Sequence, residues 1–176
     1  KTNTAILLAA LYLRDNPDAQ LVANLEDLDF GDDRLDRRVH YRDTTSGVME
    51  VAREYQDTIA LLDEMSTAAD AQTNNYAVNE SLAPLLTAKA KLGLRIIGIG
   101  HREDGKDLAP TVRSHTTHFV RQVRTHHDLD DDEYSAEFYR EHSEDSFDDH
   151  VFTLQPIPEV SASYDPDEEQ SFHVDE

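Results

Sequence analysis

Lys1 and Thr2 are residues whose types and position could do chemistry. They stand directly before Thr4–Leu13 (TAILLAALYL), an apolar run that predicts a buried helix. A lysine ammonium and a hydroxyl at a helix N-terminus suit phosphate binding, because that end of the helix carries a partial positive charge. In a G-x-x-x-x-G-K-[ST] loop the lysine reaches the β- and γ-phosphates and the hydroxyl ligates Mg²⁺. Residue 1 is lysine and not methionine, and the apolar helical run begins almost at once, so we expect a truncated chain whose first strand and glycine loop precede Lys1.

Asp63 and Glu64 form a second candidate pair. They follow Thr58–Leu62 (TIALL), a continuous apolar run that predicts a buried parallel strand. An aspartate at the carboxyl end of such a strand can hold Mg²⁺, and the adjacent glutamate can polarise the water that attacks a γ-phosphate. Acids that end a strand are also common in an acidic chain. The spacing favours the chemical interpretation, since one or two strand and helix units separate Asp63 from Lys1.

A third candidate lies in the stretch 93–120. The run Leu94–Ile99 (LRIIGI) predicts another central strand, and it leads to the polar pair His101 and Arg102. Thr116–Val123 (TTHFVRQV) follows as a plausible last strand of the same sheet.

Taken in order, these three stretches resemble the FtsK/HerA-type DNA-pumping ATPases, a branch of the P-loop NTPases. The resemblance covers about Lys1–Gln122. By position, Lys1 and Thr2 fall at the end of Walker A, and Asp63 and Glu64 fall at Walker B. His101 stands where the family has a glutamine that senses the γ-phosphate, Arg102 falls on the arginine that follows it, and Asp107-Leu108 falls on an Asp-Val-Ile-like segment.

The resemblance implies an ATPase that uses ATP and Mg²⁺ to translocate DNA, in packaging, conjugation or export, and that works as a homo-oligomer, usually a hexamer. Lys1 and Thr2 would bind the phosphates, Thr2 and Asp63 would hold Mg²⁺, and Glu64 and His101 would be catalytic. A neighbouring subunit could present an arginine finger, for which the candidates are Arg113, Arg121 and Arg124. Each of these arginines could equally neutralise a surface carboxylate.

The elements that must position these residues alternate between helix and strand. Such alternation predicts an α/β fold with a mainly parallel sheet and helices on both faces. The expected strands are Gln20–Leu25, Val39–Tyr41, Thr58–Leu62 and Leu94–Ile99, and the expected helices are Thr4–Leu13, Thr44–Tyr55 and Val78–Leu92, with Gly93 ending the last helix and a loop over Glu26–Arg38.

The amino-acid composition excludes several classes of protein. The 176 residues contain no cysteine, which excludes disulfide scaffolds and thiol chemistry, and 16 Lys+Arg against 37 Asp+Glu give a net charge of −21. Only 4 of the 16 basic residues are lysine, a pattern typical of salt-adapted proteins. No apolar run is long enough to span a membrane, so we expect a cytoplasmic protein of a halophile, its virus or its plasmid.

The charge is uneven along the chain. From Asp128 onward there are 18 acidic residues and a single Arg140. We therefore expect a partial P-loop domain over residues 1–127 and an acidic, partly disordered extension over 128–176. Within the extension, Tyr134–Arg140 could form one or two helical turns and Val151–Val160 could lie extended on the sheet.

Two other functions stay open. The α/β domain could be a scaffold whose acidic extension docks on a basic partner or mimics DNA, without catalysis. The chain could also belong to a P-loop ATPase of another family, such as a kinase or a segregation ATPase. Because the triphosphate needs the backbone N–H groups of a glycine loop, we predict no ATPase activity from Lys1–Glu176 alone.

Overall fold

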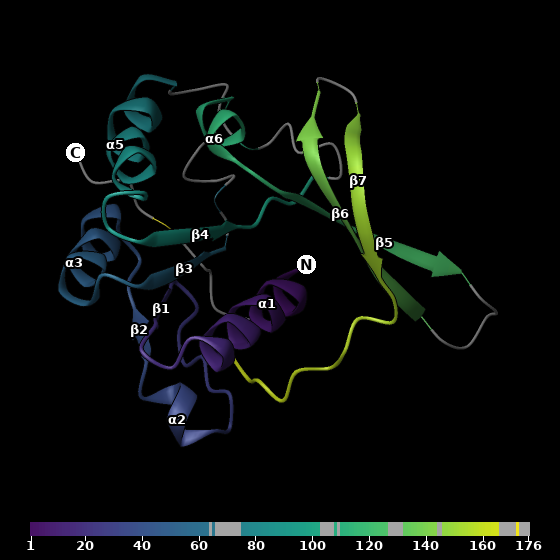
Figure 1. The fold of residues 1–176 in the computed structure, drawn as a ribbon, viewed down its shortest axis with the longest axis horizontal. Coiled ribbons are helices and arrows are strands. Elements are labelled where there is room, and N and C mark those ends of the chain that lie inside the picture. The colour runs from purple at the N-terminus through teal and green to yellow at the C-terminus, as the bar shows by residue number, and fades with distance from the viewer. Residues whose placement is uncertain are drawn as a thin grey trace.

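The computed structural model describes residues 1–63, 65, 75–102, 108, 110–126, 132–143, 146–165 and 172. The chain forms a parallel sheet flanked by helices and a separate antiparallel sheet (Figure 1). The first part comprises α1 (Thr2–Asp15), β1 (Gln20–Ala23), α2 (Asp33–Asp36), β2 (Val39–Tyr41), α3 (Thr45–Tyr55), β3 (Thr58–Leu62), α5 (Asn75–Ala88), β4 (Leu94–Gly98) and α6 (Pro110–His115). The second comprises β5 (Phe119–His126), β6 (Asp132–His142) and β7 (Phe147–Leu154).

The parallel sheet has the strand order β2-β1-β3-β4, and all of its pairs run parallel. The α/β prediction is therefore confirmed, as are the four strands near their expected ranges. One expectation differs: the stretch 26–38 was expected to be a loop, and it contains the short helix α2, whose N-cap Asp32 accepts a hydrogen bond from the Arg34 amide.

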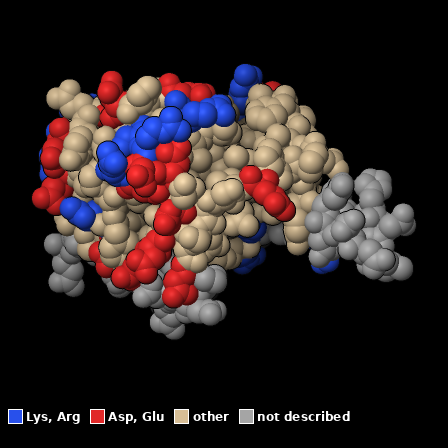
Figure 2. Space-filling model, turned by 90° about the horizontal axis from the view of Figure 1, so that it is seen from below, with Lys and Arg blue, Asp and Glu red and all other residues tan. Residues whose placement is uncertain are grey.

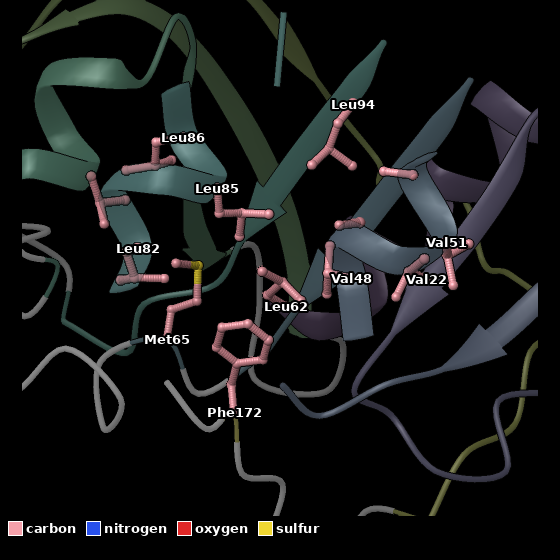
Figure 3. Packing of buried hydrophobic residues seen from close by; sticks show 13 residues of the cluster. Val22, Val48, Val51, Leu62, Met65, Leu82, Leu85, Leu86, Leu94 and Phe172 are labelled. Carbon is pink, nitrogen blue, oxygen red and sulfur yellow. The ribbon is translucent and has the colours of Figure 1, made fainter. Parts of the chain in front are cut away.

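Helices cover both faces of this sheet, as the sequence predicts. Neighbouring residues of a strand point to opposite faces, so Leu21 and Ala23 of β1 pack with α1, whereas Val22 packs with α3 (Figure 3). We call the two clusters the α1-side core and the α3-side core. The α1-side core includes Ile6, Ala9, Leu13, Leu21, Ile59 and Leu61, and the α3-side core includes Val22, Val48, Val51, Leu62, Met65, Leu82, Leu85 and Leu94.

Two helix boundaries follow the local signals. Thr44 caps α3, because its hydroxyl accepts a hydrogen bond from the Gly47 amide at 3.2 Å. Gly93 lies in the turn between α5 and β4 with a φ of 63°. A Cβ atom there would lie 2.1 Å from the carbonyl oxygen of Gln56, so only glycine fits this connection.

The antiparallel sheet has the order β5-β6-β7 and overturns two expectations. Thr116–Val123 does contain a strand, but β5 pairs with β6 and not with the parallel sheet. The helical turns expected at Tyr134–Arg140 are wrong, because β6 is an eleven-residue strand. The expected boundary near residue 127 falls between two paired strands.

The described residues of the C-terminal extension contact the parallel-sheet part of the chain. After β7 the chain returns to the parallel-sheet part, where Asp29 and Ser163 form a β-bridge with N–O distances of 2.9 and 2.8 Å. Val160, Ala162 and Tyr164 pack against the α1-side core. Phe172 is only 2% exposed and completes the α3-side core beside Met65 and Leu62 (Figure 3). Apolar side chains of the extension therefore pack in both cores, although its composition is acidic.

Charge is distributed unevenly over the surface. On the face in Figure 2, acidic side chains gather over the parallel-sheet half with a strip of Lys and Arg among them, whereas the opposite half is largely uncharged. Among the described residues, no helix has the length and apolarity that a membrane crossing requires.

Candidate functional site

The carboxyl edge of the parallel sheet brings together three of the predicted residues. All five residues of β3 are buried, which fixes Asp63 at the end of this strand, and α1 begins beside it at Thr2. Thr2 Oγ1 donates a hydrogen bond to Asp63 Oδ2 at 2.8 Å, across 61 residues of sequence. Asp63 is only 5% exposed, so its carboxylate is held in a protected position.

Asn24 positions Asp63 from the neighbouring strand. Its side-chain amide donates to the carbonyl oxygen of Asp63 at 2.9 Å and accepts from the Asp63 amide at 2.7 Å, and it is 1% exposed. Asn24 is not among the residues predicted from the sequence. A signal was present, because Asn24 is a polar side chain near the end of the apolar run QLVANL, at the carboxyl end of a strand. Buried side-chain amides in folded proteins are nearly always hydrogen-bonded, so this position predicts hydrogen bonds to a neighbouring element.

Lys1 contacts the main chain that follows β4. Its Nζ donates to the carbonyl oxygens of Gly100, at 3.1 Å, and of His101, with Arg102 O at 3.5 Å. Burial lowers the pKa of the Lys1 α-ammonium, and the Asp63 carboxylate opposes this shift. The start of α1 thus lies against both Asp63 and the end of β4.

The remaining predicted residues have different places. Glu64 and Asp107 lie outside the described residues. The His101 main chain is brought to Lys1, whereas its side chain is exposed. Arg113 belongs to α6, and Arg121 lies on β5. Arg124 is exposed on the same strand.

A cleft of about 750 Å³ opens beside this site. One wall is the whole of β4 and its continuation, 94–100, a second is the stretch 115–122, and a third is the first turns of α1. The described residues that line it include no Asp or Glu, although the chain contains 37. Five are cationic, namely Lys1, Lys89, Arg95, Arg102 and Arg121. The cleft is therefore suited to an anionic or neutral occupant.

The chemistry of the donors fits Mg²⁺ and phosphate. Mg²⁺ prefers oxygen ligands and usually takes one or two from the protein and the rest from water and substrate phosphates. The Thr2 hydroxyl and the Asp63 carboxylate supply such oxygens. The described ranges contain no group of three or more His, Asp or Glu side chains that would form an all-protein metal cage. The 14-residue helix α1 begins here, and the partial positive charge of a helix N-terminus favours a phosphate.

No family model, curated protein or solved structure matches this chain.

Proposed function

We propose that this chain is the ATP-binding part of a motor ATPase that couples ATP hydrolysis to DNA translocation. The observation that carries the proposal is the hydrogen bond between Thr2 and Asp63, with Lys1 beside it. These residues come from the stretches that resemble Walker A and Walker B, and they are adjacent at the sheet edge, as joint binding of a phosphate-bound Mg²⁺ requires.

Each residue then has a chemical role. Lys1 would neutralise charge on the β- and γ-phosphates, and Thr2 and Asp63 would hold Mg²⁺, which supplies further charge neutralisation when bound. Glu64 would orient and deprotonate the attacking water, and His101 would respond to the γ-phosphate. Asn24 would act only as a positioning residue, through the main chain of Asp63.

The contacts of Lys1 couple nucleotide binding to the segment after β4. Its Nζ donates hydrogen bonds to the carbonyl oxygens of Gly100 and His101. A phosphate that takes this ammonium must draw it away from these carbonyls, because an anion forms the stronger hydrogen bond. Binding would therefore release the main chain that carries His101, which gives a physical route from nucleotide state to a loop movement.

The motor proposal includes a homo-oligomer, with a hexamer expected from the resemblance, and DNA as the substrate that is moved. Arg113 and Arg121 remain the candidates for a finger that reaches a neighbouring subunit's γ-phosphate. The net charge of −21 makes general DNA coating unfavourable, so contact with DNA would need a local basic surface.

The test is Mg²⁺-dependent binding of a fluorescent ATP analogue in molar salt, with a chain that extends into the natural residues before Lys1. We expect Lys1→Ala to weaken binding about 10- to 100-fold, as the loss of a charged hydrogen bond does. Lys89→Ala is the matched control, because Lys89 also lines the cleft but donates to His115 O at 2.6 Å, and it should leave binding unchanged.

Measurement of ATP hydrolysis distinguishes residues that bind the nucleotide from residues that catalyse its hydrolysis. Glu64→Gln should retain nucleotide binding and lose about 10²-fold or more of the turnover, since it removes the proposed base. Stimulation of turnover by duplex DNA would support the translocation class, and its absence would favour a P-loop ATPase of another family. An extended, folded chain that binds no nucleotide would refute the proposal and favour the acidic interaction protein.

A further inference from the structure

Two buried residues, Asp63 and Met65, follow β3, and Glu64 stands between them in the sequence. Asp63 is 5% exposed and Met65 is 1% exposed. The Met65 side chain reaches the neighbouring strand β4, where a Cβ atom added at Gly98 would lie 2.5 Å from the methionine sulfur. A larger residue at position 98 would displace Met65, so the packing at the end of β3 is close and extends over two strands.

The ring of Phe172 packs on Met65 within the α3-side core. Phe172 is 2% exposed, and Figure 3 shows its ring against Met65 and Leu62, the last residue of β3. Phe172 therefore brings the last part of the chain to the strand end that carries Asp63.

The C-terminal segment is attached to the parallel-sheet part at a second place. Ser163 forms its β-bridge with Asp29, in the connection that follows β1, and Ala162 packs against the α1-side core. Because Ser163 is already held, only a short connection has to be closed for Phe172 to dock, and short closures have a small entropic cost. The docking of Phe172 is therefore supported by contacts on both faces of the sheet.

We infer that Phe172 is a positioning residue of the candidate site, which acts through Met65 on the main chain at the end of β3. The hydrogen bond from Thr2 to Asp63 depends on where this main chain lies. Asn24 supports it from β1 through two hydrogen bonds to Asp63, and Phe172 supports it through packing two residues further along. A site is held in a productive geometry when such supporting side chains are themselves packed.

The catalytic consequence of this inference rests on the proposed function. Glu64, the proposed base, has Asp63 and Met65 as its neighbours in the sequence, so its distance to the attacking water depends on both. A displacement of about 1 Å at a catalytic group can lower a rate about 100-fold. Loss of the Phe172 side chain should therefore lower kcat more than it weakens nucleotide binding, because Lys1 belongs to a different element.

The first test is hydrogen exchange of the Asp63 amide, followed by NMR on the 176-residue chain without nucleotide. This amide donates to Asn24 Oδ1 at 2.7 Å. We expect it to exchange about 10-fold or more faster in Phe172→Ala than in Leu13→Ala, because only the first variant loosens the end of β3 locally. Leu13 is the matched control, since it is 0% exposed and lies at the opposite end of α1 from Thr2.

Both variants remove a buried side chain, so exchange through global unfolding should rise in both. The urea stability of each variant gives this global contribution, and the comparison is made after it has been subtracted. Equal local exchange of the Asp63 amide in the two folded variants would overturn the inference.

The second test measures turnover in the chain extended into the natural residues before Lys1. Phe172→Ala should lower kcat about 10- to 100-fold with little change in the Kd of the nucleotide, and Leu13→Ala should leave both unchanged. Phe172→Leu keeps an apolar side chain against Met65, so it should recover most of kcat and of the amide protection, and it carries the test if the alanine variant does not fold. An unchanged kcat in folded Phe172→Ala would overturn the inference.

Failure of the inference and failure of the proposed function give different results. If the extended wild-type chain is folded and neither binds nor hydrolyses ATP, the proposed function is refuted, and exchange of the Asp63 amide still decides whether Phe172 holds the end of β3. If the wild-type chain hydrolyses ATP and Phe172→Ala behaves as Leu13→Ala does, the proposed function stands and the inference is wrong.

Discussion

The two sheets of this chain bury their strands to different degrees. In the parallel sheet, all five residues of β3 are buried between helices on two faces. In the antiparallel sheet, six of the eight residues of β7 are exposed, and the contacts are cross-strand pairs such as the stacked rings of Phe138 and Phe152, with centroids 4.2 Å apart. Hydrophobic stabilisation scales with the apolar area removed from water. The free energy of unfolding should therefore be concentrated in the parallel sheet.

Matched truncations of one side chain in each sheet test this difference. Leu61 in β3 is fully buried, so Leu61→Ala should lower the free energy of unfolding by about 3–4 kcal/mol through lost burial and the cavity left behind. Val151 in β7 is 39% exposed, and Val151→Ala should cost less than about 1 kcal/mol. Urea denaturation at fixed salt measures both. Similar losses would mean that the antiparallel sheet carries as much of the stability as the parallel one.

Phe172 tests whether the C-terminal segment belongs to the parallel-sheet core. It is 2% exposed in the α3-side core, so Phe172→Ala should lower the free energy of unfolding by about 3 kcal/mol. Phe152→Ala is the control with the same chemistry, and at 49% exposure it should cost about 1 kcal/mol. If Phe172→Ala left the unfolding midpoint unchanged, this segment would contribute nothing to the core in solution. The result also matters for deletions, because removal of 128–176 would take away both Phe172 and the partners of β5.

The difference between the sheets also explains what the sequence predicted and what it did not. A strand buried on both faces reads as a continuous apolar run, so β3 and β4 were predicted within a residue. The strands β6 and β7 carry acidic side chains between aromatic ones, and this acidic composition did not predict strands. Their pairing depends on cross-strand contacts such as Phe138 with Phe152, which no local pattern specifies.

In the candidate site, too, local sequence patterns predict some features, whereas others depend on which strands are neighbours. Asp63 was singled out because the end of an apolar strand marks its position, and in the structure it accepts a hydrogen bond from Thr2. Asn24 was missed because its role depends on β1 and β3 being neighbours, which is a property of the sheet order and not of the run that contains it. The sequence likewise did not predict that β4 is the last described strand of the sheet, because edge and central strands can have the same composition.

Asn24→Leu tests the support of Asp63 within the parallel sheet. Leucine has a similar size, so the main effect is that the amide and carbonyl of Asp63 lose their partners in a buried place. We expect a loss of about 2 kcal/mol in the free energy of unfolding and a shift of the Asp63 amide resonance. Asn16→Ala is the control, because the Asn16 side chain donates to Tyr12 O at a part-buried helix end and its loss should cost under about 1 kcal/mol. Equal effects of the two variants would contradict the positioning role of Asn24.

The smallest expected effect concerns the cluster of Tyr12, Asp57 and Arg95, which joins α1 to β4, the last described strand of the parallel sheet. Tyr12 Oη donates to Asp57 Oδ1 at 2.8 Å, Arg95 donates to the same oxygen at 3.0 Å, and the guanidinium lies 4.7 Å from the Tyr12 ring centroid. Tyr12→Phe should cost about 1 kcal/mol near pH 8, as the loss of a half-exposed hydrogen bond does. Tyr134→Phe, exposed on β6, is the control and should have no measurable effect.

The pH dependence of this cost identifies the phenol as its source. Burial, together with the hydrogen bond to Asp57, raises the pKa of Tyr12 from 10.0 to about 12. The folded state therefore favours the neutral phenol, and its contribution to stability is complete below about pH 10 and is lost as the pH rises to about 12. The difference in urea midpoint between wild type and Tyr12→Phe should shrink across that window. A difference that stayed constant from pH 8 to pH 12 would mean that the variant acts through ring packing against Arg95, and the tether between α1 and β4 would then be cation–π in character instead of a hydrogen bond.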